Sequence, residues 1–216
     1  MKNGRTETNI DVEPNSKPYL FKRIISDGTD TAAIFLLFLL ISYLLFASPL
    51  AGTYNAHYEN AEKIKNGVVA ELGEDAQAIT DRLNGDVRYN EERFAANLHS
   101  YLIKLLAGFI AEAAVLLLVP LVSRERATPG KLLTGLIPFN EKRQTKAACP
   151  AIFLRFLFIF IIDSAIFYLF TGIFTFLLIP VLRLIEMLFN KKNKTVCDAL
   201  TGVMIIEKLS YNGIDK

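Results

Sequence analysis

Long runs of apolar residues dominate the hydrophobic pattern of this chain. The first run covers residues 31–50, the second covers 101–122, and the third extends over 151–189 with four charged interruptions. Twenty helical residues, at about 1.5 Å each, cross the roughly 30 Å hydrocarbon core of a bilayer. A signal peptide fits the first run less well, because the run is long and lacks a small-x-small cleavage site. The pattern predicts an all-α membrane protein.

The third run is too long for one helix at ordinary tilt. Thr171-Gly172 is its natural break, since glycine weakens a helix interior and permits a turn. We therefore expect a span at about 151–170 and a second element at about 173–190. The second element is compatible with a full span, a re-entrant piece or an interfacial helix. A full span gives a small polytopic bundle of four spans.

The segment between the first two runs, 51–100, has an amphipathic pattern instead. Apolar residues recur there at helical spacing: Ala61, Ile64, Val68 and Leu72. Asn84-Gly85 predicts a turn, and a second helix from about residue 88 leads into the second run. We expect a helical insertion that serves either as a solvated cap or as a lid for a ligand or partner.

The two ends of the chain differ from the apolar domain that covers 19–208. Residues 1–18 contain few large apolar side chains and two prolines, which predicts a disordered tail. Residues 209–216 are expected to form a short C-terminal tail.

The distribution of charge predicts the orientation. Over the whole chain the net charge is only +2, but residues 1–30, 123–150 and 191–216 together contain 16 Lys and Arg. The segment 50–100 contains five, against nine Asp and Glu. Since basic residues beside spans stay in the cytoplasm, four crossings with both termini cytoplasmic fit this distribution. The loop 123–150 is then cytoplasmic, the insertion is extracytoplasmic, and the multi-pass protein is expected in the cell membrane.

Charged side chains within apolar helices are costly, so they are usually paired or functional. Arg23, Asp27 and Asp30 recur at spacings of four and three residues, which places them on one helix face. Glu112 and Asp163 lie inside the second and third runs. A carboxyl group in a low-dielectric site can exchange a proton near neutral pH. The acids in these runs are therefore candidates for a proton relay or a cation site.

Two further regions carry polar candidates. Arg183 and Glu186 are three residues apart and are expected to pair with each other. In the loop, Thr128 can cap the segment that follows the Pro-Gly turn, and Lys131 can anchor that segment at the interface. At the C-terminal end, residues 191–208 predict a short element that folds back on the cytoplasmic face. There we expect Asp198 to meet Arg23.

Three motifs carry a resemblance to a known family. The first is Arg23-Ile-Ile-Ser-Asp-Gly-Thr-Asp30, at the head of the first span. The second is Thr128-Pro129-Gly130-Lys131-Leu-Leu-Thr-Gly-Leu, followed by Arg155 at the opening of the next span. The third is Thr-Val-Cys-Asp198-Ala-Leu-Thr-Gly202-Val, with Cys197 where many relatives have His. In order and spacing these motifs resemble the RDD family of bacterial membrane proteins, named for one arginine and two aspartates. The resemblance implies a multi-span inner-membrane protein that is suspected of transport, and some relatives are credited with sodium/proton antiport.

Three classes of function follow from these observations. The first is a small-solute or cation/proton transporter, which with four spans implies a homo-oligomer, at least a dimer. The second is an accessory or assembly protein that binds another envelope protein. An enzyme is not expected, because His57 and His99 lie 42 residues apart and no catalytic or metal-ligand cluster is visible. No cofactor, metal or nucleic acid is expected, since the basic clusters sit beside the spans, and the lipid bilayer is the expected partner.

Overall fold

The computed structural model describes residues 17–140, 145–170, 174–189 and 194–208, and within them the chain is mostly helical. The chain divides into two compact units. Unit 1 comprises residues up to Leu36 and from Ala111 onward, and unit 2 comprises Leu37–Ile110. The predicted tails and the predicted break at residues 171–172 lie largely or wholly outside the described residues.

Unit 2 is helical throughout, as the amphipathic pattern predicts. It contains the C-terminal part of α1 (Lys17–Phe46), the short turn η1 (Pro49–Ala51), α2 (Gly52–Leu72), α3 (Ala76–Gly85) and most of α4 (Val87–Glu112). The predicted turn lies where α3 ends, and the Asp86 carboxylate accepts the Tyr89 amide at 2.9 Å to begin α4. A second turn, at Gly73 with φ of 69°, was not predicted.

Packing between α2 and α4 brings together the two histidines of unit 2. The rings of His57 and His99 stack with their centroids 5.5 Å apart. His57 Nδ1 also lies 2.6 Å from the Glu92 carboxylate, and the Asn60 amide donates to the same group. The side chains of the insertion therefore contact one another across its two long helices.

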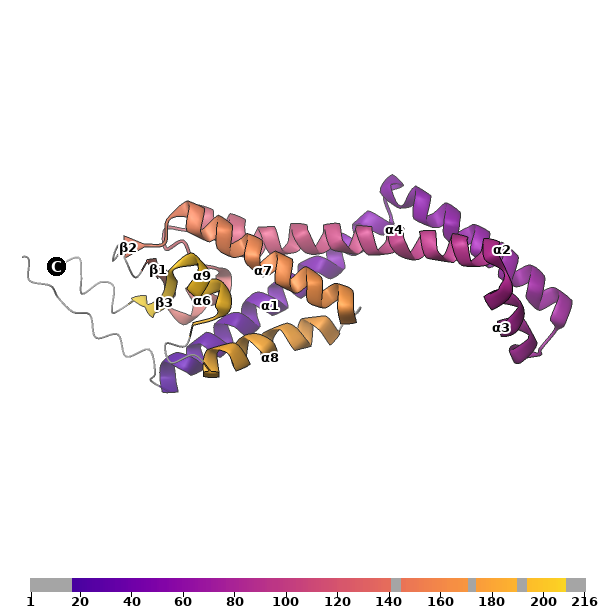
Figure 1. Ribbon diagram of the computed structural model, residues 1–216. Coiled ribbons are helices and arrows are strands. Elements are labelled where there is room, and N and C mark those ends of the chain that lie inside the picture. Colours follow the sequence, from indigo (N-terminus) through magenta and orange to yellow (C-terminus); the bar gives the residue numbers. More distant parts are fainter. Residues whose placement is uncertain (1–16, 141–144, 171–173, 190–193, 209–216) are drawn as a thin grey trace, which may run out of the picture. The chain divides into compact units, whose positions relative to one another are not determined.

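Unit 1 is built from the first part of α1 and a series of helices from its second segment. The chain passes from α4 through a π-helical turn, η2 (Ala113–Leu118), into α5 (Val119–Val122). The remaining helices are α6 (Pro129–Thr134), α7 (Cys149–Phe170), α8 (Phe174–Phe189) and α9 (Val196–Thr201). Helices α7 and α8 run side by side (Figure 1).

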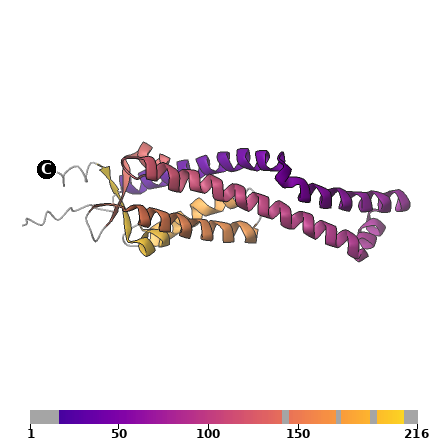
Figure 2. The same ribbon diagram turned by 90° about the horizontal axis from the view of Figure 1, so that it is seen from above.

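A three-stranded antiparallel sheet corrects the all-α expectation. Its order is β2-β1-β3, with β1 at Leu136–Asn140, β2 at Thr145–Lys146 and β3 at Val203–Glu207. Strands β1 and β3 are rich in branched apolar residues, which favour extended backbone once a glycine has ended the preceding short helix. The element predicted to fold back at the C-terminal end is therefore α9 followed by β3. Figure 2 shows these strands beside the beginnings of α1 and α7.

The distribution of polarity in unit 1 is the reverse of that in a water-soluble domain. Arg23, Lys131 and Asp198 are at most 2% exposed, whereas Val122 and Phe189 are 87% exposed. A surface of this kind is stable against lipid, where apolar side chains face the hydrocarbon and charged groups pair inside. Two helical segments of the described chain, Tyr19–Phe46 and Val87–Val122, are long and apolar enough to cross a membrane.

Gly130 brings α6 unusually close to α1. A Cβ atom at this position would lie 2.1 Å from the backbone oxygen of Ser26 and 3.0 Å from the carboxylate of Asp30. Only glycine therefore permits this approach, which explains the Pro-Gly-Lys sequence at the start of α6.

Gly130→Ala should destabilise unit 1 because the added methyl group meets backbone that cannot rotate away. We expect a loss of about 1–3 kcal/mol or more, as in other overpacked cores. Gly28→Ala on the adjoining helix is the matched control, because nothing lies within 4 Å of its Cβ position. Thermal unfolding in detergent, followed by size-exclusion chromatography, should show a lower midpoint for the first variant alone. Equal midpoints for the two variants would contradict the close approach.

Candidate functional site

A polar cavity of about 320 Å³ lies within unit 1. It is large enough for several water molecules, each of which occupies about 30 Å³ in the liquid. Residues from α1, η2, α6, α7, α8 and α9 line it together. The charged lining residues are Asp27, Asp30, Lys131, Arg155, Asp163, Arg183 and Glu186.

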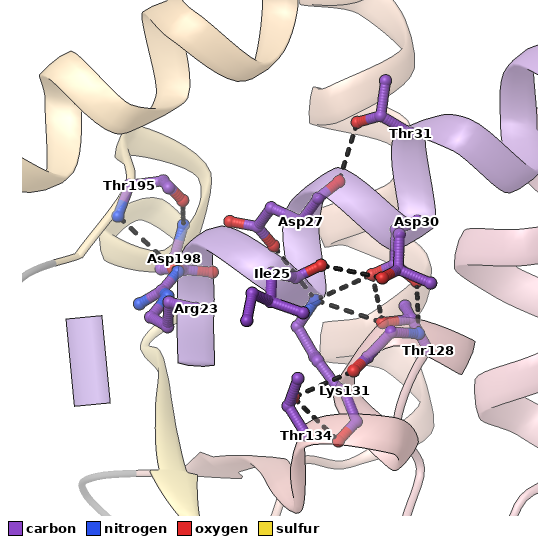
Figure 3. A network of polar contacts seen from close by, with 12 residues as sticks. Arg23, Ile25, Asp27, Asp30, Thr31, Thr128, Lys131, Thr134, Thr195 and Asp198 are labelled. Carbon is purple, nitrogen blue, oxygen red and sulfur yellow. Dashed lines mark hydrogen bonds and ion pairs between the residues drawn. The ribbon is translucent and has the colours of Figure 1, made fainter. Parts of the chain in front are cut away.

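The first cluster beside the cavity centres on Asp30 of α1 (Figure 3). One carboxylate oxygen of Asp30 accepts the Gly130 amide at 2.7 Å, and the other accepts the Thr128 hydroxyl at 2.5 Å. The Lys131 ammonium donates to Asp30 at 3.3 Å and lies 3.5 Å from Asp27. Because Asp30 satisfies both a backbone amide and a lysine, it fixes the start of α6 on α1.

The second cluster centres on Asp198 of α9, which is fully buried. Its two oxygens accept from Arg23 of α1 and Arg155 of α7, each at 2.8 Å. Burial alone would raise the pKa of the Asp198 carboxyl, but the charges of Arg155 and Arg23 outweigh it and hold this pKa well below its ordinary value. Asp198 is therefore an anion at every physiological pH, and it joins three helices.

The third cluster lies between α7, α8 and the end of α4. Arg183 donates to Asp163 at 2.5 Å. The Glu112 side chain lies within electrostatic range of both groups and is 8% exposed. Its Oε2 atom is buried and has no hydrogen-bond partner among the described residues. This oxygen is free to take a proton or to contact a cation.

Comparison with known proteins follows the same residues. The model of the RDD family matches residues 17–202, which is most of the chain and includes all three clusters. The chain belongs to the RDD family. No curated protein and no solved structure matches it.

In this RDD membrane protein the predicted contact between Arg23 and Asp198 is confirmed. The structure also places the motif residues Asp30, Thr128, Gly130 and Lys131 in one cluster. Arg155 shares Asp198 with Arg23, and Gly202 ends α9 with a left-handed φ of 64°. The three separated motifs of the RDD protein therefore meet in one folded region.

Three expectations about individual side chains were wrong. Arg183 pairs with Asp163 rather than with Glu186, whose carboxylate accepts the Val196 amide at 3.2 Å. Thr128 occupies the cap position of α6, but its hydroxyl donates to Asp30 instead of capping. Lys131 is buried beside two aspartates instead of anchoring α6 at the interface. In each case a partner distant in sequence outcompetes the local one.

The sequence interpretation missed two features of the RDD site. Thr195 and Asp198 form a capping box at the start of α9, and the Thr-x-x-Asp spacing is a known signature of that motif. Cys197 lines the cavity, where burial raises the pKa of its thiol above the ordinary value. No local pattern identifies Cys197 as a lining residue, because α9 is only six residues long.

Asp30→Asn should destabilise the RDD protein more than Asp27→Asn. The first change removes an anion that holds Lys131, Thr128 and the start of α6, and breaking a buried pair of this kind costs about 3–5 kcal/mol. The second removes only the longer contact, so we expect a loss of about 1 kcal/mol, near the range of weak ion pairs. Unfolding midpoints of both variants in nanodiscs provide the comparison. The reverse order would show that Asp27 holds Lys131.

Proposed function

We propose that this RDD protein is a small cell-membrane transporter that exchanges a cation, or a proton in its place, through the cavity of unit 1. The observation that carries the proposal is the partnerless buried oxygen of Glu112, next to Asp163 and Arg183. A carboxylate in such surroundings gains from any positive charge that reaches it. An inward-facing polar site among apolar helices is the usual mark of an ion or substrate pathway.

The charge balance of the site favours a cation over an anion. Among the described residues that line the cavity, three are basic and four are acidic. The pair of Arg23 and Asp198 beside it leaves this balance unchanged, and Glu112 adds a further acid. The lining is therefore short of positive charge when every group is ionised, and a proton or monovalent cation restores neutrality.

A four-span topology with both termini cytoplasmic accompanies the proposal. It rests on the two segments that are apolar enough to span, the exposed apolar surfaces of α7 and α8, and the concentration of basic residues in three chain segments. Four spans give a narrow conducting path, so we propose that the transporter works as a homo-oligomer, at least a dimer, in the lipid bilayer.

Glu112→Gln should abolish exchange while leaving the fold intact, because the amide keeps the size of the side chain but carries no charge. The measurement is uptake of sodium and movement of protons in proteoliposomes across pH 6–9. Glu62→Gln is the matched control, since Glu62 pairs only with Lys65 on α2 of unit 2. No flux above empty vesicles for the unmodified protein, with several monovalent cations, would overturn the proposal.

Cysteine labelling tests the topology separately from the flux. Cys149 at the start of α7 is exposed and should react with an impermeant maleimide only after the cell membrane is opened. A Glu74→Cys variant, made with Cys149 and Cys197 replaced by Ser, should react in intact cells, because residue 74 lies between α2 and α3 of the insertion. Labelling of both sites from the same side would contradict four crossings.

An accessory role is the second candidate. Unit 2 exposes large apolar side chains on α4, including Val87 and Phe94 at 70% and 69%. Exposed groups of this size are typical of surfaces that meet lipid or protein. If the protein serves another envelope protein, crosslinking in cells should return one stoichiometric partner, and recovery of the protein alone would exclude this role.

A further inference from the structure

We infer that unit 1 consists of two copies of one helix–helix–helix–strand repeat, and that unit 2 is an insertion within the first copy. The first copy comprises α1, the end of the α4–α5 segment, α6 and β1. The second comprises α7, α8, α9 and β3. This inference concerns how the fold is built and does not rest on transport.

The boundaries of the elements coincide at fixed offsets. Helix α5 ends at Val122 and α8 ends at Phe189, 67 residues later. The same offset of 67 relates α6 to α9 and β1 to β3 at both of their ends. Helices α1 and α7 begin at Lys17 and Cys149, an offset of 132.

Local hydrogen bonding repeats with the same offset. Thr134 donates to the carbonyl oxygens of residues 130 and 131 at 2.9 and 3.3 Å. Its equivalent, Thr201, donates to those of residues 197 and 198 at 2.8 and 3.4 Å. Gly135 and Gly202 then end the two helices with φ of 70° and 64° and ψ of 28° and 22°. Two unrelated segments would rarely share an entire bonding pattern.

The pairing of β1 with β3 has the symmetry that two copies require. Leu136 is paired with Glu207 and Asn140 with Val203, and exchanging the copies converts one pair into the other. Pro138, at the centre, is paired with its own equivalent, Ile205. The two strands are therefore related by a local two-fold axis.

Equivalent side chains also converge on the site. Arg23 and Arg155 are each the seventh residue of their helix, and both bind Asp198. Lys131 and Asp198 are equivalent residues of α6 and α9 with opposite charges. Three equivalent pairs line the cavity: Asp27 with Ile159, Asp30 with Ile162, and Leu116 with Arg183. The cavity thus lies between the copies, as substrate sites do in transporters built from repeats.

The different offsets identify the insertion. The first copy is 65 residues longer than the second between its first and second helices. Unit 2, which was delimited by its internal contacts alone, covers Leu37–Ile110 in the same place. Removing residues 39–106 would leave helices of 22 and 16 residues, the lengths of α7 and α8.

An excision variant tests the inference without any flux assay. Residues 39–106 are replaced by Thr-Gly-Ile, the sequence that joins α7 to α8. Asn140→Cys and Val203→Cys are added in a background without Cys149 and Cys197, because these two positions are register partners. We expect the same yield of disulfide in the excised and the full-length protein, and little disulfide from the mismatched pair Asn140→Cys with Ile206→Cys. A full-length protein that forms the disulfide and a folded excision variant that does not would overturn the inference.

A graft in the full-length chain decides the matter if the excision variant cannot be recovered. Val196→Pro, Cys197→Gly and Ala199→Leu give α9 the sequence of α6 while retaining Asp198. The control exchanges the first two changes, as Val196→Gly with Cys197→Pro, which disfavours helix in the residue before the proline. We expect the graft to lower the unfolding midpoint by at most about 5 °C and the control by at least twice as much. Equal losses would overturn the equivalence of α6 and α9.

Discussion

Charged groups that are removed from water must find opposite charges, and this constraint organises unit 1. Removing one partner of a buried pair costs about 3–5 kcal/mol, a large share of the stability of a typical domain. The first turns of α1 meet the constraint for both short helices. Arg23 binds the acidic residue of α9, while Asp27 and Asp30 bind the basic residue of α6. Opposite charges thereby assign each short helix to its own place on α1.

The same constraint explains why the site tolerates an unsatisfied group. The clusters around Asp30 and Asp198 have close partners for each carboxylate oxygen. Glu112 lies at the end of α4, directly before the π-helical turn, and one of its oxygens lacks a partner among the described residues. Helical irregularities of this kind are frequent at functional sites. The stable clusters hold the helices in place, so that one acid can remain available to a mobile charge.

The sequence predicted the helical part of this fold well. The spans and the helical insertion follow from apolar runs and amphipathic spacing, which are local signals. The contact between Arg23 and Asp198 was predictable because both positions belong to family motifs at the same end of the bundle. The sheet was not predicted, since β1 and β3 are five-residue strands separated by more than 60 residues. The pairing of Arg183 with Asp163 was missed for a similar reason: a local neighbour, Glu186, offered the same charge.

The most direct test of the central claim is a double-mutant cycle on Arg23 and Asp198. Arg23→Gln, Asp198→Asn and the double variant are compared with the unmodified protein by equilibrium unfolding in lipid nanodiscs at pH 7. Residues in one buried ionic network should show a coupling free energy, and we expect about 2 kcal/mol. Additive effects, with a coupling below about 0.5 kcal/mol, would show that this pair does not hold α9 on α1.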